Sequence, residues 1–208
     1  MNKILFSLVT MASLASAGGC LLVQSNDMNV TWRAYKTLAK LGVAGQFTEV
    51  NYTPNMKEGK NFRELLVGSK VSIDIAKIET KNEGRDKTLV ENFFGKLSGK
   101  TIDGVIVAMR ADPKERGKRV YHGLIDVNIT MNSRSLKIPM KYNYKKEIFT
   151  ATGVIDLFDF SAGDALKSIN KSCYDLHKGK TWSDVTIGFS TNIKATLCHV
   201  NVEEKKKR

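Results

Sequence analysis

Alternation of apolar and polar residues is the feature that most constrains how this chain folds. Apolar side chains occupy every second position within residues 26–35, 71–76, 125–131 and 185–195. A period of two is typical of strands that bury one face. Further strands are predicted, from apolar runs or shorter alternation, at 46–52, 102–109, 136–144 and 148–160. The chain is therefore predicted to be all-β, with about eight antiparallel strands.

Two segments, residues 86–97 and 164–178, have helical periodicity instead. Their apolar residues recur at three- and four-residue spacing, which predicts two short amphipathic helices. Thr88 and Glu91 have the spacing of a capping box in the first helix, and Gly179 is suited to end the second.

The turn Asn132-Ser133 is predicted to join two of the strands as a hairpin. Many strands with two helices favour an up-and-down antiparallel barrel over a sandwich, because the helices can cover its open ends. A barrel of about eight strands either holds one small elongated ligand or is filled by its inward side chains. Alternation alone leaves both possibilities open.

The N-terminus has the pattern of a secretory signal peptide over residues 1–17. Lys3 gives a positive start, residues 4–14 are mainly apolar, and Ala15-Ser16-Ala17 is a small-x-small cleavage pattern. We therefore expect an exported protein. The alternative is a lipoprotein signal over residues 1–19, which would leave an acylated Cys20 at the N-terminus.

Cys20, Cys173 and Cys198 remain after cleavage at residue 17. An oxidising compartment permits one disulfide and leaves one thiol over. If the first and last strands of the barrel are neighbours, Cys20 and Cys198 lie at one rim, and a disulfide between them would contribute about 4 kcal/mol. Cys173 with Cys198 is the other candidate pair.

The chain is basic, with 33 Lys and Arg against 21 Asp and Glu and a formal charge of +12. Only Lys3 among the charged residues would leave with the signal peptide. A basic excess is typical of proteins with phosphate-bearing partners. In an exported protein it favours an anionic membrane surface, or simple solubility, over nucleic acid. Residues 203–208 are interpreted as a solvated charged tail after a single domain over residues 18–202.

No residue pattern indicates catalysis or a bound metal. The sequence has no Gly-x-Ser-x-Gly elbow and no Cys-x-x-Cys motif, and His122, His177 and His199 are scattered. We therefore expect a protein that is not an enzyme, with no catalytic residues, no metal and no cofactor.

Four segments, in order along the chain, resemble the YceI-like family of periplasmic polyisoprenoid-binding proteins. The longest runs from Ile78 to Phe94 and contains Arg85-Asp86 and the pair Phe93-Phe94. The other three are Gly42 to Phe47, Ala151 to Phe160 and Asp184 to Ile187. The resemblance implies a lipocalin-like barrel in the periplasm that holds a long isoprenoid or fatty chain.

The resemblance also implies a set of site residues. Side chains expected to line the lipid-binding interior are Trp32, Phe47, Ile73, Ile75, Phe93, Phe94, Val105, Val107, Val127, Ile187 and Phe189. Arg85 and Asp86 are expected at the mouth of the barrel, beside the lipid head group. Without a ligand, the aromatic residues are explained as packed core, Asp86 as a helix cap and Arg85 as the partner of a carboxylate.

Two functions fit these observations. The first is a periplasmic carrier or scavenger that holds an apolar lipid chain inside the barrel without catalysis. The second is a filled barrel that uses its basic surface to bind anionic lipid or an acidic partner. The oligomeric state has no signature in the sequence.

Overall fold

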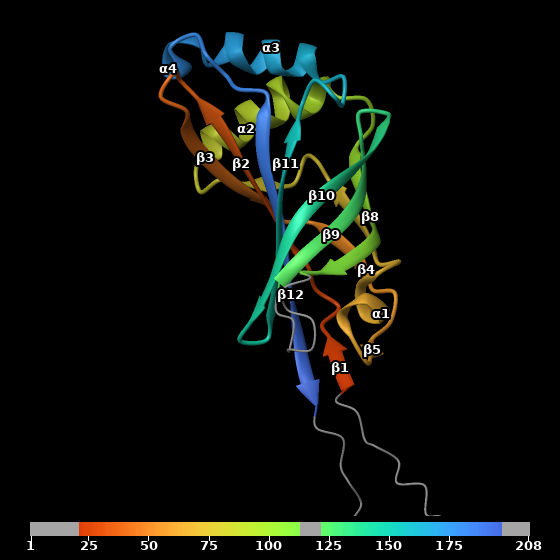
Figure 1. Ribbon diagram of the computed structural model, residues 1–208. Coiled ribbons are helices and arrows are strands. Elements are labelled where there is room, and N and C mark those ends of the chain that lie inside the picture. The colour runs from red at the N-terminus through yellow and green to blue at the C-terminus, as the bar shows by residue number, and fades with distance from the viewer. Residues whose placement is uncertain (1–20, 113–121, 197–208) are drawn as a thin grey trace, which may run out of the picture.

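A computed structural model describes residues 21–112 and 122–196 of the chain (Figure 1). It consists mainly of strands, with a few short helices. The strands are β1 (Leu21–Gln24), β2 (Asn29–Lys36), β3 (Leu41–Phe47), β4 (Val50–Thr53), β5 (Glu58–Gly59), β6 (Lys70–Asp74), β7 (Ile78–Glu79), β8 (Thr101–Ala111), β9 (His122–Met131), β10 (Arg134–Lys145), β11 (Ile148–Asp156) and β12 (Asp184–Thr196). The helices are α1 (Phe62–Leu66), α2 (Glu83–Asn92), the 3₁₀ turn η1 (Phe94–Lys96), α3 (Gly163–Ser172) and α4 (Tyr174–His177).

All strands belong to one antiparallel sheet with the order β4-β6-β8-β9-β10-β11-β12-β2-β3-β7, and β1 adds to β12 and β5. The sheet curls into a half-barrel (Figure 1), so the prediction of an antiparallel lipocalin-like fold is confirmed. Within the described residues the sheet has 12 strands rather than about eight, because short strands such as β5 and β7 add to the long ones. Among the described residues, β4 and β7 are the two ends of the hydrogen-bonded path.

The hairpin predicted at Asn132-Ser133 is confirmed between β9 and β10. Both turn residues have a positive φ, 50° and 59°, as a two-residue turn of this twist requires. The Asn132 side chain also accepts a hydrogen bond from the Ser98 amide (2.7 Å) and donates one to the Phe160 carbonyl (2.9 Å). The turn is thereby tied to the loop before β8 and to the loop before α3.

The interior of the half-barrel contains two apolar clusters. The cluster around α1 is densely packed, with Leu65 and Leu66 fully buried and Tyr142 stacked on Phe149 at a centroid distance of 5.3 Å. The other cluster lies under α2 and α3, which cover the opposite end of the sheet (Figure 1). Ala165, Leu166 and Ile169 on α3 are buried against it.

The two predicted helices exist, but their boundaries differ from the prediction. The first begins at residue 83, because the Asn82 side chain accepts a hydrogen bond from the Arg85 amide (2.9 Å) and so caps the helix. The predicted capping box was wrong, since Thr88 lies inside the helix and donates to the Gly84 carbonyl (2.8 Å). The second helix is divided into α3 and α4 at Cys173, and ends before Gly179 as predicted.

Two predicted strands are shorter or divided. The strand predicted at 148–160 ends at Asp156, whose carboxylate accepts a hydrogen bond from the Phe158 amide (2.9 Å) and begins a turn. The strand predicted at 46–52 is divided into the end of β3 and β4, which lie at different places in the sheet.

The first and last strands of the described chain are neighbours, with Leu21 paired opposite Thr196. The candidate disulfide partners Cys20 and Cys198 lie outside the described residues, as do the predicted signal peptide and the tail at 203–208. No helix in the described part of the chain has the length and apolar character to cross a membrane.

Candidate functional site

A cavity of about 500 Å³ lies in the half of the barrel that is covered by the helices. Most of its wall is apolar and comes from the inner face of the sheet, from α2 and η1, and from α3. The predicted site residues that line it are Trp32, Phe47, Ile73, Phe93, Phe94, Val127, Ile187 and Phe189. The barrel is thus hollow at one end and filled at the other.

Phe189 and Val127 lie at the boundary between the two halves. Both line the cavity, while Phe189 stacks on Phe149 of the packed cluster at a centroid distance of 6.2 Å and Val127 is itself a member of that cluster. The packed cluster therefore forms the floor of the cavity.

Ile75, Val105 and Val107 were predicted to line the interior, and none of them contacts the cavity. Ile75 is buried in the surrounding core. Val105 and Val107 lie on the outer face of β8, and Val107 is 36% exposed. Residues 102–109 form a mostly apolar run, and a run without alternation does not indicate which face is buried.

Residues of α3 and α4 complete the cavity wall, although the sequence did not assign them to the site. Leu166, Ile169, Cys173 and Leu176 all line it. Their helical spacing is visible in the sequence as an apolar stripe. That stripe predicts a buried face without indicating whether the face meets packed side chains or a cavity.

Arg85 lines the cavity at the start of α2, and Asp86 does not. Arg85 donates from Nε to the Thr80 hydroxyl (2.8 Å) and from Nη2 to the Thr80 carbonyl (2.6 Å). Asp86 accepts hydrogen bonds from the amide (3.0 Å) and the hydroxyl of Thr80. The expected helix cap at Asp86 and carboxylate partner of Arg85 were both wrong. Thr80, which directly follows β7, donates to Asp86 and accepts from Arg85 instead.

The lining residues that reach solvent include Asn82 and Gly84 at the start of α2 and Leu176 on α4. Lys36 at the end of β2 and His177 line the same region. The mouth of the cavity therefore lies between α2 and α4 and carries polar and cationic groups above an apolar interior.

His177 is oriented by a chain of hydrogen bonds at this mouth. Asn170 donates from Nδ2 to the Gly179 carbonyl (3.4 Å), so its Oδ1 accepts from the Thr181 hydroxyl (2.8 Å). His177 Nδ1 must then donate to Thr181 Oγ1 (2.7 Å), which leaves Nε2 as an acceptor in the neutral ring. Burial lowers the pKa of His177, and the nearby charge of Lys36 lowers it further.

Trp32 lines the cavity with its ring and keeps an unpaired polar atom buried. Its side chain is buried, and Nε1 has no hydrogen-bond partner among the described residues. A Cβ on Gly45 of β3 would lie 2.3 Å from Trp32 Cζ2 and 3.0 Å from Thr80 Cγ2, so only glycine fits there. The indole thus lies close to Thr80, the partner of Arg85.

A second depression, on the outer face of β12, β2 and β3, is more open and more polar. Its wall includes Arg33, Lys81 and the hydrogen-bonded pair Gln46–Glu79 (2.6 Å). An open polar surface of this kind offers an apolar ligand less burial than the cavity does. Among the described residues, no group of histidine, cysteine and carboxylate side chains is arranged to hold a metal ion.

Comparison with protein families and solved structures shows which proteins this chain resembles. The YceI-like domain matches residues 22–194, and no curated protein matches the chain. A polyisoprenoid binding domain from Saccharophagus degradans aligns with a TM-score of 0.54 at 11% identity, over 85% of this chain and 98% of that one.

Two other solved structures share the fold. Burkholderia cenocepacia BcnA aligns with a TM-score of 0.53 at 13% identity, over 80% of this chain and 96% of that one. The Campylobacter jejuni YCEI protein aligns with a TM-score of 0.51 at 16% identity, over 74% of this chain and 85% of that one. At these identities the structures support the fold, and the domain match, which covers most of the chain, shows that this protein belongs to the YceI-like family.

Proposed function

We propose that this protein binds an apolar lipid chain, an isoprenoid or fatty chain, inside the cavity and carries or scavenges it without catalysis. The observation that carries the proposal is the apolar cavity itself, closed by packed side chains at one end and open to a polar mouth at the other. Its volume of about 500 Å³ lies within the range of about 300–1,000 Å³ that is typical of ligand pockets.

Burial of the chain would supply the affinity. Each Å² of apolar surface removed from water contributes about 25 cal/mol, before the cost of ordering the ligand. The polar groups at the mouth suit a head group that stays near water. Arg85, whose guanidinium has more N–H groups than the two that Thr80 accepts, offers donors to an oxygen of that head group.

The relatives support the same ligand class. A polyisoprenoid binding domain has this fold, and the family resemblance of this chain extends over nearly the whole described structure. The mostly apolar wall of the cavity favours an apolar chain with few polar atoms over a sugar or nucleotide. A filled barrel does not account for the cavity.

We also propose that the protein works in the periplasm. The signal-peptide pattern over residues 1–17 supports export, with acylation at Cys20 as the alternative after a signal of residues 1–19. Fractionation of the wild type and Cys20→Ser separates these forms. A lipoprotein would move from the membrane to the soluble fraction, whereas a disulfide-linked protein would stay soluble and lose stability.

Mass spectrometry of organic extracts tests the ligand proposal. The protein is purified from its native source without detergent, and we expect an isoprenoid or fatty lipid in about equal amount to the protein. A clean absence of lipid, together with no uptake of added isoprenoids, would contradict the proposal.

A further inference from the structure

We propose that one corner of the molecule docks on the surface of an anionic phospholipid membrane. The corner consists of the end of β2 with the β2–β3 turn (residues 36–40) and the segment 171–184, and we call it the basic corner. This proposal goes beyond lipid binding in the cavity, because it concerns the outer surface of the protein and a second partner, the membrane.

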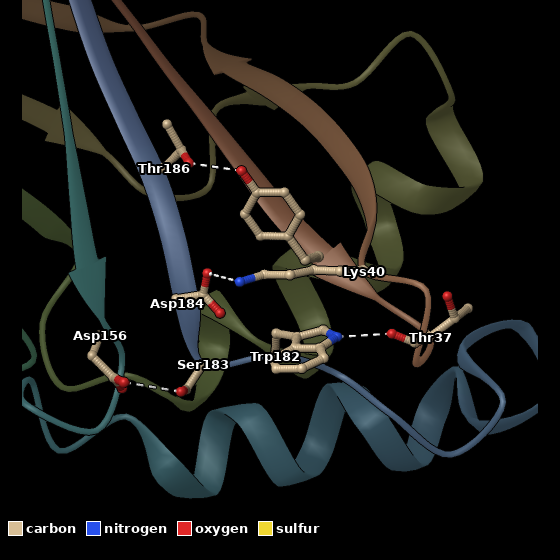
Figure 2. Close-up of polar contacts among 8 residues, drawn as sticks. Thr37, Lys40, Asp156, Trp182, Ser183, Asp184 and Thr186 are labelled. Atoms are coloured by element: carbon tan, nitrogen blue, oxygen red, sulfur yellow. Dashed lines mark hydrogen bonds and ion pairs between the residues drawn. The ribbon is translucent and has the colours of Figure 1, made fainter.

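The two segments of the basic corner form one surface. Trp182 donates from Nε1 to the Thr37 carbonyl (2.8 Å), and the Thr37 amide donates to the Lys180 carbonyl (2.9 Å). Figure 2 shows Trp182 held beside the β2–β3 turn in this way. Tyr174 lies against Gly179, so α4 belongs to the same surface.

Large apolar side chains project from this surface into solvent. Leu38 is 82% exposed, Leu176 is 71% exposed and Tyr174 is 62% exposed. Leu38 lies at the tip of a turn, and the other two lie on a helix of only four residues. Most of the surface of these side chains is exposed to solvent, and such a cluster fits the apolar boundary of a bilayer.

Lysine residues lie close to these apolar side chains in the sequence. Residues 36–40 and 171–184 contain the lysines Lys36, Lys40, Lys171, Lys178 and Lys180, and only the carboxylates Asp175 and Asp184. Lys40 Nζ lies 2.7 Å from Asp184 and 4.9 Å from the centre of the Trp182 ring (Figure 2). Lys180 Nζ lies over the same ring at 4.7 Å. The excess of lysine fits the negative surface of an anionic leaflet, to which each cation contributes attraction.

A second exposed apolar side chain, which lies near carboxylates and not near lysines, provides a comparison. Phe158 is 59% exposed in the turn after β11, with Asp156 and Asp159 beside it in the sequence. Carboxylates beside an apolar side chain are repelled by an anionic membrane. Phe158 is therefore a matched control for Leu38.

The basic corner adjoins the mouth of the cavity. Lys36, Leu176, His177 and Trp182 line the cavity, and they belong to the basic corner. A protein docked through this corner would hold the mouth of the cavity against the lipid head groups. A lipid chain then passes between bilayer and cavity with little exposure to water.

Co-sedimentation with vesicles tests the proposal on the full mature chain. We expect binding to vesicles of phosphatidylcholine with phosphatidylglycerol, none to phosphatidylcholine alone, and a sharp loss at high ionic strength. Lys171→Glu with Lys178→Glu should weaken binding by at least about fivefold per lysine. Leu38→Ser should also weaken it, whereas Phe158→Ser should bind like the wild type.

Equal binding to both vesicle types, or wild-type binding by the Leu38 and lysine variants with unchanged thermal melts, would overturn the proposal. So would sedimentation-velocity data that show a dimer broken by Leu38→Ser with no vesicle binding. Uptake of a dispersed isoprenoid without vesicles is measured in parallel on Leu38→Ser. If the wild type takes up the isoprenoid normally but does not bind vesicles, only the docking proposal is contradicted. If it binds vesicles but takes up no isoprenoid, only the proposed function is contradicted.

Discussion

At the scale of single residues, the ring of Trp32 gives a direct probe of the cavity wall, because the ring lines the cavity while its nitrogen is buried. Trp32→Phe keeps an aromatic ring and removes part of the apolar surface. We expect affinity for an isoprenoid quinone and for a hydrocarbon such as squalene to fall alike, by about fivefold, the value of about 40 Å² of apolar contact. A loss for the quinone alone in a fluorescence titration would show that Trp32 acts on the head group and not through the cavity wall.

His177 gives a prediction about pH. Its pKa in the folded protein lies below its ordinary value of 6.5, chiefly because of burial. Below pH 6.5 the unfolded chain therefore binds more protons at this residue, so stability falls as the pH drops toward the folded pKa. Urea unfolding at neutral and mildly acidic pH should show a smaller acid loss for His177→Gln than for the wild type. The same loss in both would contradict this role, and His122→Gln, at an exposed histidine, is the control.

At the scale of elements, α3 closes the cavity through a few buried side chains. Ile169 is buried and lines the cavity, so Ile169→Ala enlarges an existing space rather than creating a new one. We expect a loss of about 2–4 kcal/mol in the free energy of unfolding, measured by urea denaturation. Lys167→Ala, on the exposed side of the same helix, should change stability by less than about 0.5 kcal/mol. Similar losses for both would mean that α3 is not packed as described.

The long elements were predictable from the sequence, and the short ones were not. β9, β10 and β12 alternate clearly, and their hairpin and sheet positions follow from that period. β5 and β7 have two residues each, and α1 has five, which is too short for any period to appear. The start of α2 was missed because its cap, Asn82, lies before the apolar stripe that marks the helix.

The candidate site was predictable in part for the same reason. Trp32 and Ile187 lie on strands with clean alternation, and the structure places both on the cavity wall. Val105 and Val107 lie in a run that carries no information on facing. The roles of Thr80 and Cys173 depend on contacts between distant segments, which no local pattern encodes.

At the scale of the whole molecule, the two halves of the barrel have different roles. The packed half around α1 gives stability and a floor, and the half under α2 and α3 gives space for a ligand. Part of the formal charge of +12 is concentrated at the basic corner, beside the mouth of the cavity. Together, the proposed function and the proposed docking predict that the protein exchanges its lipid at a membrane surface.

Uptake of an isoprenoid by a pair of matched variants tests the central claim most directly. Ile129 is half-buried and lines the cavity, whereas Thr130 is the next residue on β9 and faces outward. We expect Ile129→Trp to fill the cavity and reduce isoprenoid affinity by at least about tenfold, and Thr130→Trp to bind like the wild type. Equal binding by both variants, with both folded by circular dichroism, would contradict a lipid chain held inside this barrel.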